Sequence, residues 1–224
     1  MLEISATLTD EMKKLIENLM RQMGIKDPIE AIRRINSGEW EVRQLTPRWT
    51  SLDDGTISFS VTSDGTTGPE WIKRLGKKGF GPSWGACHML CSSDFKPTNG
   101  VKCEIKVLRG KLWYDKDRKT HIIRQYAEIC GLKTPNAEIA CLVRENFSDD
   151  DLSDMGLNWI VTMHRSIEND KGVWCLLMSS RVYREGRWLI DVKAETSRNN
   201  WLPEGGFAFI VSQTNKEKEE DGES

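Results

Sequence analysis

Four short β-rich runs joined by tight turns end the chain, and they constrain its fold more than any other feature. Their sequences are WIVTMH (159–164), VWCLLMSSRVY (173–183), RWLIDVKAE (187–195) and FAFIVSQ (207–213). Turn-forming residues separate them at 169–172, at Glu185-Gly186 and at 203–206. Short connections of this kind favour antiparallel neighbours. We therefore predict a mostly antiparallel sheet that ends in a C-terminal β-meander.

Two strand patterns come earlier in the chain. The segment 48–63, RWTSLDDGTISFSVTS, has two β-rich runs around Asp54-Gly55 and predicts a hairpin. In 101–109 the apolar residues Val, Cys, Ile and Val alternate with Lys, Glu and Lys. This period of two predicts a half-buried strand with its lysines on the exposed side.

Helical patterns fill much of the first two-thirds. Capping residues and glycines predict helices at 8–23, 27–38, 69–76, 84–91, 116–130, 135–146 and 149–155. In the second, Asp27 and Glu30 form a candidate capping box, and Ile29, Ile32 and Ile35 form an apolar stripe that we expect to be buried. The predicted fold class is α+β, with helices mainly in the first two-thirds and a mostly antiparallel sheet.

The chain divides into three parts by sequence. We expect an N-terminal helical hairpin appendage at 1–45, a single α+β domain at 46–214 and a disordered acidic tail at 215–224. The apolar faces of segment 8–35 also make self-association a candidate role for the appendage. Because its spacing lasts barely two heptads, packing on the main body is the simpler interpretation.

Composition excludes several classes of protein. A hydrophobic content of 38% with 29% charged residues is typical of a folded globular protein. No apolar run approaches the ~20 residues of a membrane span, and the N-terminus lacks the pattern of a secretory signal. Six cysteines in a chain that lacks such a signal favour a reducing cytoplasm. We expect a cytoplasmic protein with no membrane partner and no cofactor.

Charge is distributed unevenly along the chain. Segment 69–125 has thirteen Lys and Arg against five acids, a balance of +8, whereas the whole chain has a net charge of −2. Aromatic residues are interleaved with these cations, at Trp71, Phe80, Trp84, Phe95, Trp113 and Tyr114. Cations that neutralise phosphates, next to aromatic faces that stack on bases, are typical of sequence-tolerant binding to nucleic acid.

The leading functional hypothesis is therefore a non-enzymatic binding protein that engages a polyanion, with nucleic acid as the foremost candidate. The predicted polyanion-binding residues are Lys73, Arg74, Lys77, Lys78, Lys102, Lys106, Arg109, Lys111, Trp113 and Arg118. The simpler alternative is a solvated surface whose aromatic residues are buried. Lysines on a strand also deter edge-to-edge pairing.

A second candidate site is the segment SDGTTGPE (63–70), which follows a predicted strand and opens a predicted helix. Its free backbone N–H groups at Gly65, Thr66, Thr67 and Gly68 could attract an anion. The alternative function is then a small enzyme acting on a phosphorylated metabolite at the Gly65–Glu70 helix end. An ordinary Asp-Gly turn before a proline-started helix explains the same residues without a ligand.

The stretch GFGPSWGAC (79–87) contains Gly81-x-Ser83-x-Gly85, the spacing of a hydrolase nucleophile elbow. A true elbow needs a buried strand that leads straight into the serine. The basic, glycine-broken sequence before Ser83 leaves no room for that strand. We therefore interpret this stretch as a joint in which Ser83 caps the helix that begins near Trp84.

Three other constellations give weaker signals. The set Cys87, His88, Cys91 and Cys103 lacks the usual zinc spacing, so we predict no metal site. The spacing of segment 127–142 partly resembles a helix–turn–helix motif, but its acidic character favours an ordinary helical hairpin. Asp191 and His164 are candidate catalytic groups on separate strands, and nothing in their spacing places them together. Whether the protein is an enzyme stays open.

Several distinct segments of the sequence resemble a known family. They are ISFSVTSDGTTGPEWIKRLGKKGF (57–80), DFKPTNGV (94–101), KTPNAEIACLVRENFSDDDLSDMGLNWIVTMH (133–164) and GFAFIVSQ (206–213). Together they resemble a family of uncharacterised bacterial proteins from small-genome candidate lineages. The resemblance covers roughly 56–213 and implies a bacterial cytosolic protein with one contiguous domain. It implies no activity. The N-terminal helices lie outside it, and a protein–protein adaptor that uses them is a third candidate function.

Overall fold

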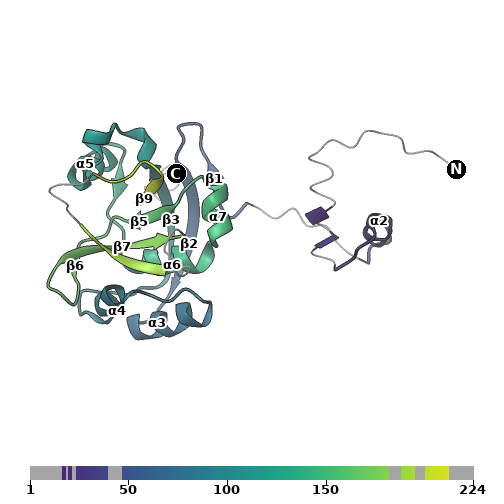
Figure 1. The fold of residues 1–224 in the computed structure, drawn as a ribbon, viewed down its shortest axis with the longest axis horizontal. Coiled ribbons are helices and arrows are strands. Elements are labelled where there is room, and N and C mark those ends of the chain that lie inside the picture. Colours follow the sequence, from purple (N-terminus) through teal and green to yellow (C-terminus); the bar gives the residue numbers. More distant parts are fainter. Residues whose placement is uncertain are drawn as a thin grey trace, which may run out of the picture. The chain divides into compact units, whose positions relative to one another are not determined.

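The structure is a computed structural model, and it describes residues 17–18, 20–21, 24–39, 47–181, 188–194 and 200–211 (Figure 1). The chain divides into two compact units, Met1–Thr46 and Pro47–Ser224. The predicted first helix lies largely outside the described residues, and the predicted acidic tail lies entirely outside them. Among the described residues, no helix is long and apolar enough to cross a membrane.

The first unit contains helix α2 (Pro28–Asn36). The Asp27 carboxylate accepts a hydrogen bond from the backbone N–H of Ile29, as expected of a cap. Glu30, by contrast, pairs with Arg33 and Arg34 instead of completing the predicted capping box. The predicted buried stripe is wrong for Ile29 and Ile32, which are 76% and 46% exposed. The buried face of the helix passes through Ala31.

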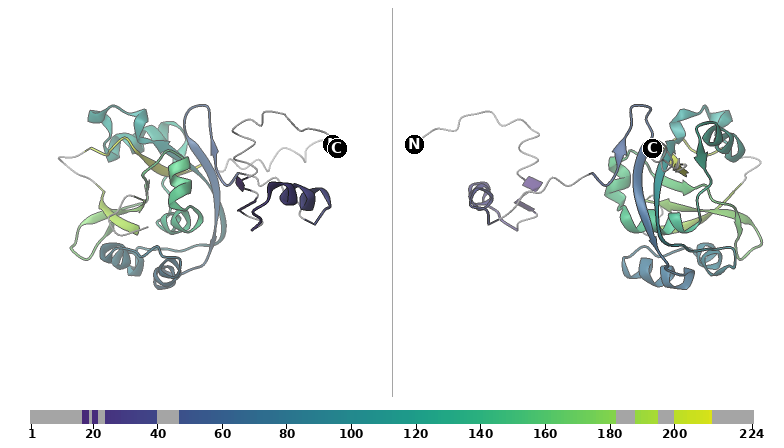
Figure 2. Two further views of the ribbon diagram at one scale, coloured as in Figure 1. Left: turned by 45° about the vertical axis from the view of Figure 1, so that its right-hand side comes forward. Right: turned by 180° about the vertical axis from the view of Figure 1, so that it is seen from behind.

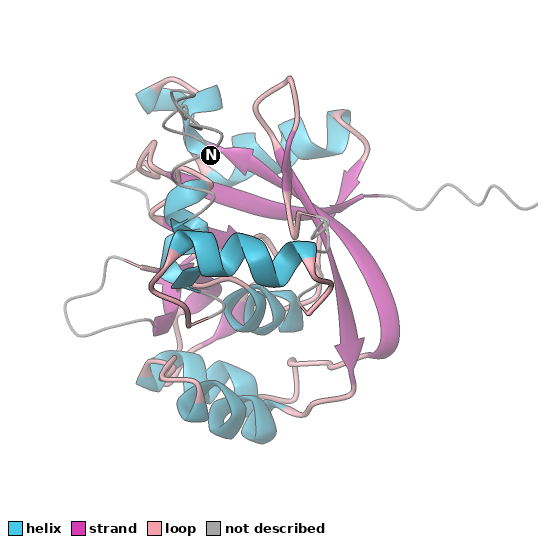
Figure 3. Cartoon of the chain, turned by 90° about the vertical axis from the view of Figure 1, so that its right-hand side faces the viewer, coloured by secondary structure: helices cyan, strands magenta, loops and turns pink. Residues whose placement is uncertain are grey.

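In the described part of the second unit, one nine-stranded sheet forms the centre. Its strands are β1 (Thr50–Ser51), β2 (Ile57–Asp64), β3 (Asn99–Arg109), β4 (Leu132–Lys133), β5 (Trp159–Thr162), β6 (Ile167–Glu168), β7 (Trp174–Ser180), β8 (Trp188–Lys193) and β9 (Gly205–Val211). The order is β1-β2-β3-β9-β5-β7-β6, with β4 beside β9 and β8 beside β7. All pairings are antiparallel except that of β5 with β9. Figure 3 shows the twist of these strands in side view. The predicted α+β class with a mostly antiparallel sheet is confirmed.

The predicted C-terminal meander holds for only part of the sheet. Strands β6, β7 and β8 follow one another as antiparallel neighbours, and β5 also pairs antiparallel with β7. Strand β9 then returns to lie between β3 and β5, parallel to β5. Two glycines at the start of β9 make this insertion sterically feasible. A Cβ atom on Gly205 would overlap the ring of Trp159, and one on Gly206 would overlap Val107.

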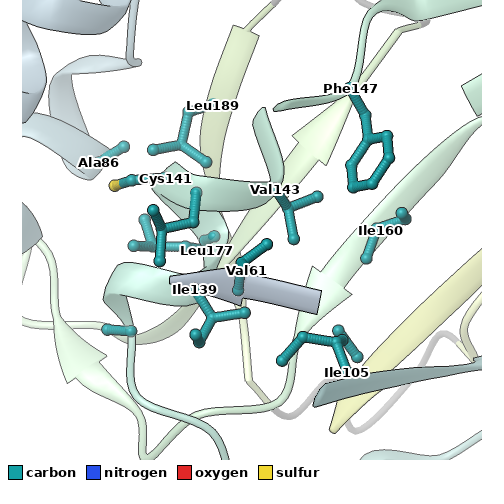
Figure 4. Close-up of a cluster of buried hydrophobic side chains, with 14 of the residues drawn as sticks. Val61, Ala86, Ile105, Ile139, Cys141, Val143, Phe147, Ile160, Leu177 and Leu189 are labelled. Carbon is teal, nitrogen blue, oxygen red and sulfur yellow. The ribbon is translucent and has the colours of Figure 1, made fainter. Parts of the chain in front are cut away.

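Helices cover both faces of the sheet. One face packs against α6 (Glu138–Asn146), whose residues from Glu138 to Arg144 are all buried. Figure 4 shows part of this core, in which Val143 and Phe147 lie near Ile105 and Ile160. The other face packs against α5 (Thr120–Ile129) through Ile123 and Ala127. The alternation of side chains along each strand supplies apolar residues to both layers.

The other helical elements lie around this core. They are α3 (Gly68–Lys77), α4 (Trp84–Cys91), α7 (Asp149–Asp154) and two 3₁₀ turns, η1 (Gly110–Leu112) and η2 (Asp115–Asp117). Helix α5 begins at Thr120 rather than at 116, because the preceding residues form η2. Helices α3 and α4 lie at one end of the unit and α5 lies at the other end in all views (Figures 1 and 2).

Candidate functional site

The predicted anion site at the start of α3 is occupied by the chain's own carboxylates. Asp64 accepts hydrogen bonds from the backbone N–H and the hydroxyl of Thr66. Glu70 accepts the equivalent pair from Thr67, with its carboxylate 2.9 Å from the backbone nitrogen. A hydrogen bond from the Arg74 guanidinium is the largest cause that lowers the pKa of Asp64, and a hydrogen bond from Thr66 is the next. Together they bring this pKa to about 2. These carboxylates are therefore charged at neutral pH and would repel an incoming anion.

The glycines of the same segment serve packing and turn geometry. Gly65 has a positive φ of 79°, and Gly68 lies so close to α4 that a Cβ atom there would overlap the carbonyl of Leu90. Gly68 therefore lets α3 and α4 pack closely.

Two of the predicted cations, Arg74 on α3 and Lys78 directly after this helix, are paired with a distant acid. Arg74 Nε lies 2.6 Å from Glu145 Oε1, and Lys78 Nζ lies 2.8 Å from the same oxygen. Arg74 also stacks over the ring of Trp71 at 4.6 Å and pairs with Asp64. The charge of this cluster is therefore largely balanced. Lys73 and Lys77 on the same helix are exposed.

Two predicted arginines hold the fold together. Arg109 donates from Nε to the carbonyl of Gly55 at 2.7 Å and from Nη1 to the carbonyl of Met155. Arg118 is buried, and it donates from Nε to the carbonyl of Trp201 at 2.6 Å. These hydrogen bonds commit at least two of the five N–H donors of each guanidinium to the fold, so both residues have a structural role at their positions.

Lys102 and Lys106 lie on β3 two positions apart from Glu104, as the alternation of the strand predicted. Lys102 is exposed and Lys106 is half-buried. The hydroxyl of Ser58 on the neighbouring strand donates to Glu104 at 3.2 Å. This polar side of the β2–β3 ladder therefore has charges of both signs.

The remaining part of the basic segment is residues 111–119, which we call the aromatic–basic turn. It spans part of η1, all of η2 and the residues that lead into α5. Tyr114 is 81% exposed. It borders an open hollow of about 670 Å³ that is lined by Trp113, Tyr114, Asp115 and Lys116. Lys111 and Lys119 are exposed in the same turn.

Packing and hydrogen bonds fix the base of this turn. The ring of Trp113 makes edge contacts with Tyr126 at 5.5 Å and with Phe207 at 5.8 Å. Arg118 donates from Nη1 to the carbonyl of Trp113 at 2.9 Å and pairs with the carboxylate of Asp115. The backbone N–H of Trp201 in turn donates to the carbonyl of Arg118 at 2.9 Å. The turn therefore presents Tyr114 from a base anchored in the core.

The structure does not bring the ten predicted polyanion-binding residues together into one surface. Those on α3 lie at the opposite end of the unit from α5, which directly follows the aromatic–basic turn (Figures 1 and 2). Lys111, Trp113 and Arg118 share that turn. Sequence reasoning grouped Tyr114, Lys116 and Lys119 with the basic region but did not select them as site residues. The signal that could have identified them is that all three lie within one short segment of the chain.

The Gly81-x-Ser83-x-Gly85 stretch is a joint, as predicted. Ser83 Oγ accepts from the backbone N–H of Ala86 at 3.1 Å and donates to Asp191 Oδ1 on β8 at 2.6 Å. Asn169 Nδ2 donates to the other carboxylate oxygen at 3.0 Å. Partial burial favours a raised pKa for Asp191, but these hydrogen bonds outweigh it and lower the pKa. Gly85 leaves room for the carboxylate, because a Cβ atom there would overlap it.

His164 has a structural role in the sheet. Strands β5 and β6 pair with the same side of β7, and the ladder between them is interrupted. In that gap His164 Nε2 accepts from the backbone N–H of Leu177 at 2.9 Å, and Nδ1 donates to the carbonyl of Arg165. Burial lowers the pKa of His164 to about 4, so the ring is neutral. Both ring nitrogens are engaged by the backbone.

The other two constellations differ in their burial. Helix α6, which contains the second half of the helix–turn–helix segment, is too buried to enter a groove. Burial raises the pKa of the Cys87 and Cys103 thiols, which disfavours the thiolate that a metal needs. Within the described ranges, no group of three or more His, Cys, Asp or Glu residues could hold a metal ion.

Comparison of the chain with protein-family models, with curated proteins and with solved structures finds no match. The resemblance to a bacterial family therefore stays a prediction from the sequence.

Proposed function

We propose that this protein is a binding protein whose aromatic–basic turn contacts a polyanion, with nucleic acid as the foremost candidate. The observation that carries the proposal is the exposed ring of Tyr114 beside an open hollow, with Lys111, Lys116 and Lys119 in the same turn. Among the described residues, none of these three lysines has an ion-pair partner. Arg118 compensates the charge of Asp115.

Physical chemistry connects this arrangement to a phosphate polymer. Each lysine that neutralises a phosphate releases condensed counterions, and this release supplies most of sequence-independent affinity. An exposed aromatic ring adds a stacking surface that accepts any base. The turn combines both elements within nine residues. The α3 cluster has less capacity, because Glu145 and Asp64 already balance Arg74 and Lys78.

The experiment compares two variants with equal loss of charge. One combines Lys111→Gln, Lys116→Gln and Lys119→Gln, and the control combines Lys73→Gln, Lys77→Gln and Lys96→Gln, which are also exposed. Affinity for labelled single- and double-stranded DNA and RNA is measured by fluorescence anisotropy at low salt. We expect the first variant to lose binding at least about 10-fold more than the control. Absence of binding by the unmodified protein to every oligonucleotide would contradict the proposal.

The same proposal places the protein in a reducing compartment such as the bacterial cytoplasm. All six cysteines are free, and two of them, Cys91 and Cys130, are exposed. Exposed thiols persist in reducing compartments and tend to oxidise elsewhere.

A protein–protein adaptor is the second candidate, because α2 exposes Ile29 and Ile32. Exposed large apolar side chains on one short helix are suited to packing against another helix. Deletion of residues 1–46 removes this unit at the observed boundary. A lower molar mass of the truncated protein by light scattering, beyond the mass removed, would support self-association through α2. An unchanged oligomeric state and unchanged partners would eliminate this candidate.

The enzyme acting on a phosphorylated metabolite is less supported. Asp64 and Glu70 occupy the helix end at which it was predicted.

A further inference from the structure

The walls of the hollow in the aromatic–basic turn indicate which polyanion it suits. Two of its four lining residues, Trp113 and Tyr114, are aromatic, and one, Lys116, is a cation. A ligand made only of phosphate would gain from the cation and nothing from the rings. A ligand with exposed planar bases gains from both, because base–aromatic stacking does not depend on base identity.

The size of the site further limits the ligand. The hollow is open to solvent and is lined by four consecutive residues, so it offers room for one exposed base beside Tyr114 and does not enclose a larger ligand. In a duplex the base faces are stacked inside, so a base could reach Tyr114 only after its base pair is broken. Three lysines in one turn also suit a few consecutive phosphates better than the 6–10 contacts of typical duplex-binding proteins.

Preorganisation favours stacking at this position. Tyr114 is held between Trp113, whose ring packs on Phe207, and Asp115, which pairs with Arg118. The side chain of Asn200 donates to the carbonyl of Asp115. Because the flanking backbone is already fixed, a stacked base would order little more than one tyrosine side chain. The entropic cost of binding is correspondingly small.

We propose that the aromatic–basic turn binds single-stranded nucleic acid, with one base stacked on Tyr114 in the hollow and the neighbouring phosphates on Lys111, Lys116 and Lys119. This inference rests on the proposed function and specifies its ligand. Single-stranded chains are the nucleic acids whose bases are free to leave the stack and meet an aromatic side chain.

The test uses the full chain and four probes: a single-stranded oligonucleotide, the same length of abasic backbone, the corresponding duplex, and inorganic polyphosphate. We expect the single strand to bind most tightly. Tyr114→Ala should weaken its binding by roughly 5- to 150-fold, the equivalent of losing one stacked base. The same change should leave polyphosphate and abasic binding nearly unaltered. Tyr114→Phe should retain the affinity, because phenylalanine also presents a stacking face.

Trp84→Ala is the matched control, since Trp84 is 78% exposed on α4, at the other end of the unit. It should leave all four affinities unchanged. Equal binding of the single strand and polyphosphate, both insensitive to Tyr114→Ala, would overturn the stacking inference while leaving polyanion binding intact. Binding to none of the four probes would overturn the proposed function itself. Preference for the duplex would also overturn the inference.

Discussion

His164 makes the stability of the fold depend on pH. Its pKa is lowered from about 6.5 to about 4, first by burial and also by the charge of Arg124. Above pH 6.5 the ring is neutral in both folded and unfolded chains. As the pH falls from 6.5 towards 4, the unfolded chain binds a proton that the folded chain does not. The free energy of unfolding therefore decreases over this window, by roughly 3 kcal/mol in total for this group.

Urea unfolding between pH 4 and pH 7 measures this effect, with His164→Gln and the exposed His121→Gln as the pair of variants. We expect His164→Gln to be destabilised at pH 7, because it disturbs the acceptor for Leu177, and to lose most of the pH dependence in this window. His121→Gln should retain the dependence. A His164→Gln protein with the same slope as the unmodified chain would rule out this account.

Gly85 and Asp191 form a second residue-scale test. Gly85→Ala should destabilise the fold by about 1–3 kcal/mol, because the new Cβ atom would overlap the Asp191 carboxylate. In an Asp191→Ala background the same change should cost much less, since the overlapping atoms are gone. Denaturant unfolding of the four proteins of this cycle gives the coupling. Additive effects would show that the joint does not depend on this contact.

The sequence predicted the helix-capping role of Ser83 but not its contact with Asp191. Ser83 was recognisable as a helix cap because its position before Trp84 is a local pattern. Asp191 lies 108 residues away in the chain, so no local pattern connects it to Ser83. Asn169, the other partner of that carboxylate, was recognisable only as a turn residue.

At the scale of elements, the insertion of β9 decides the topology. Gly206→Ala should destabilise the protein by about 3 kcal/mol or more, because its Cβ would overlap Val107 and lie 3.1 Å from a methyl group of Leu157. Gly76→Ala on α3 is the control, since a Cβ atom there meets nothing within 4 Å. It should stabilise the protein by up to about 1 kcal/mol through helix propensity. Thermal or urea unfolding measures both changes, and equal effects would contradict the steric account.

The same strand shows where prediction from local pattern ends. The turn-forming residues 169–172 correctly predicted antiparallel neighbours, because a short connection leaves few alternatives: β7 pairs antiparallel with β6 across this turn and also with β5. The turn-forming residues 203–206 favoured an antiparallel neighbour for β9 next to β8 in the chain, but β9 pairs with β3 and β5 instead. The predicted start of α5 at 116 was also wrong. The charged residues 116–119 are compatible with a helix, and the local sequence does not show that Arg118 is buried.

At the scale of the whole molecule, the fold divides a basic segment that is continuous in sequence. Its α3 portion meets Glu145, which is 71 residues from Arg74 in the chain, and its β3 portion alternates with Glu104. The alternation with Glu104 was visible in the sequence, but the pairing of Arg74 with Glu145 could not be predicted from composition, because these partners are distant in the chain. In the aromatic–basic turn, Asp115 pairs with Arg118 and not with the exposed lysines.

The dependence of binding on salt tests the central claim most directly. The logarithm of the association constant for a single-stranded oligonucleotide is plotted against the logarithm of salt concentration, for the unmodified chain and for the variant lacking Lys111, Lys116 and Lys119. Three phosphate contacts predict that the slope of the unmodified chain is steeper by about 2 than that of the variant, at about 0.7 per contact. Equal slopes for the two proteins would contradict the claim that this turn is the polyanion-binding surface.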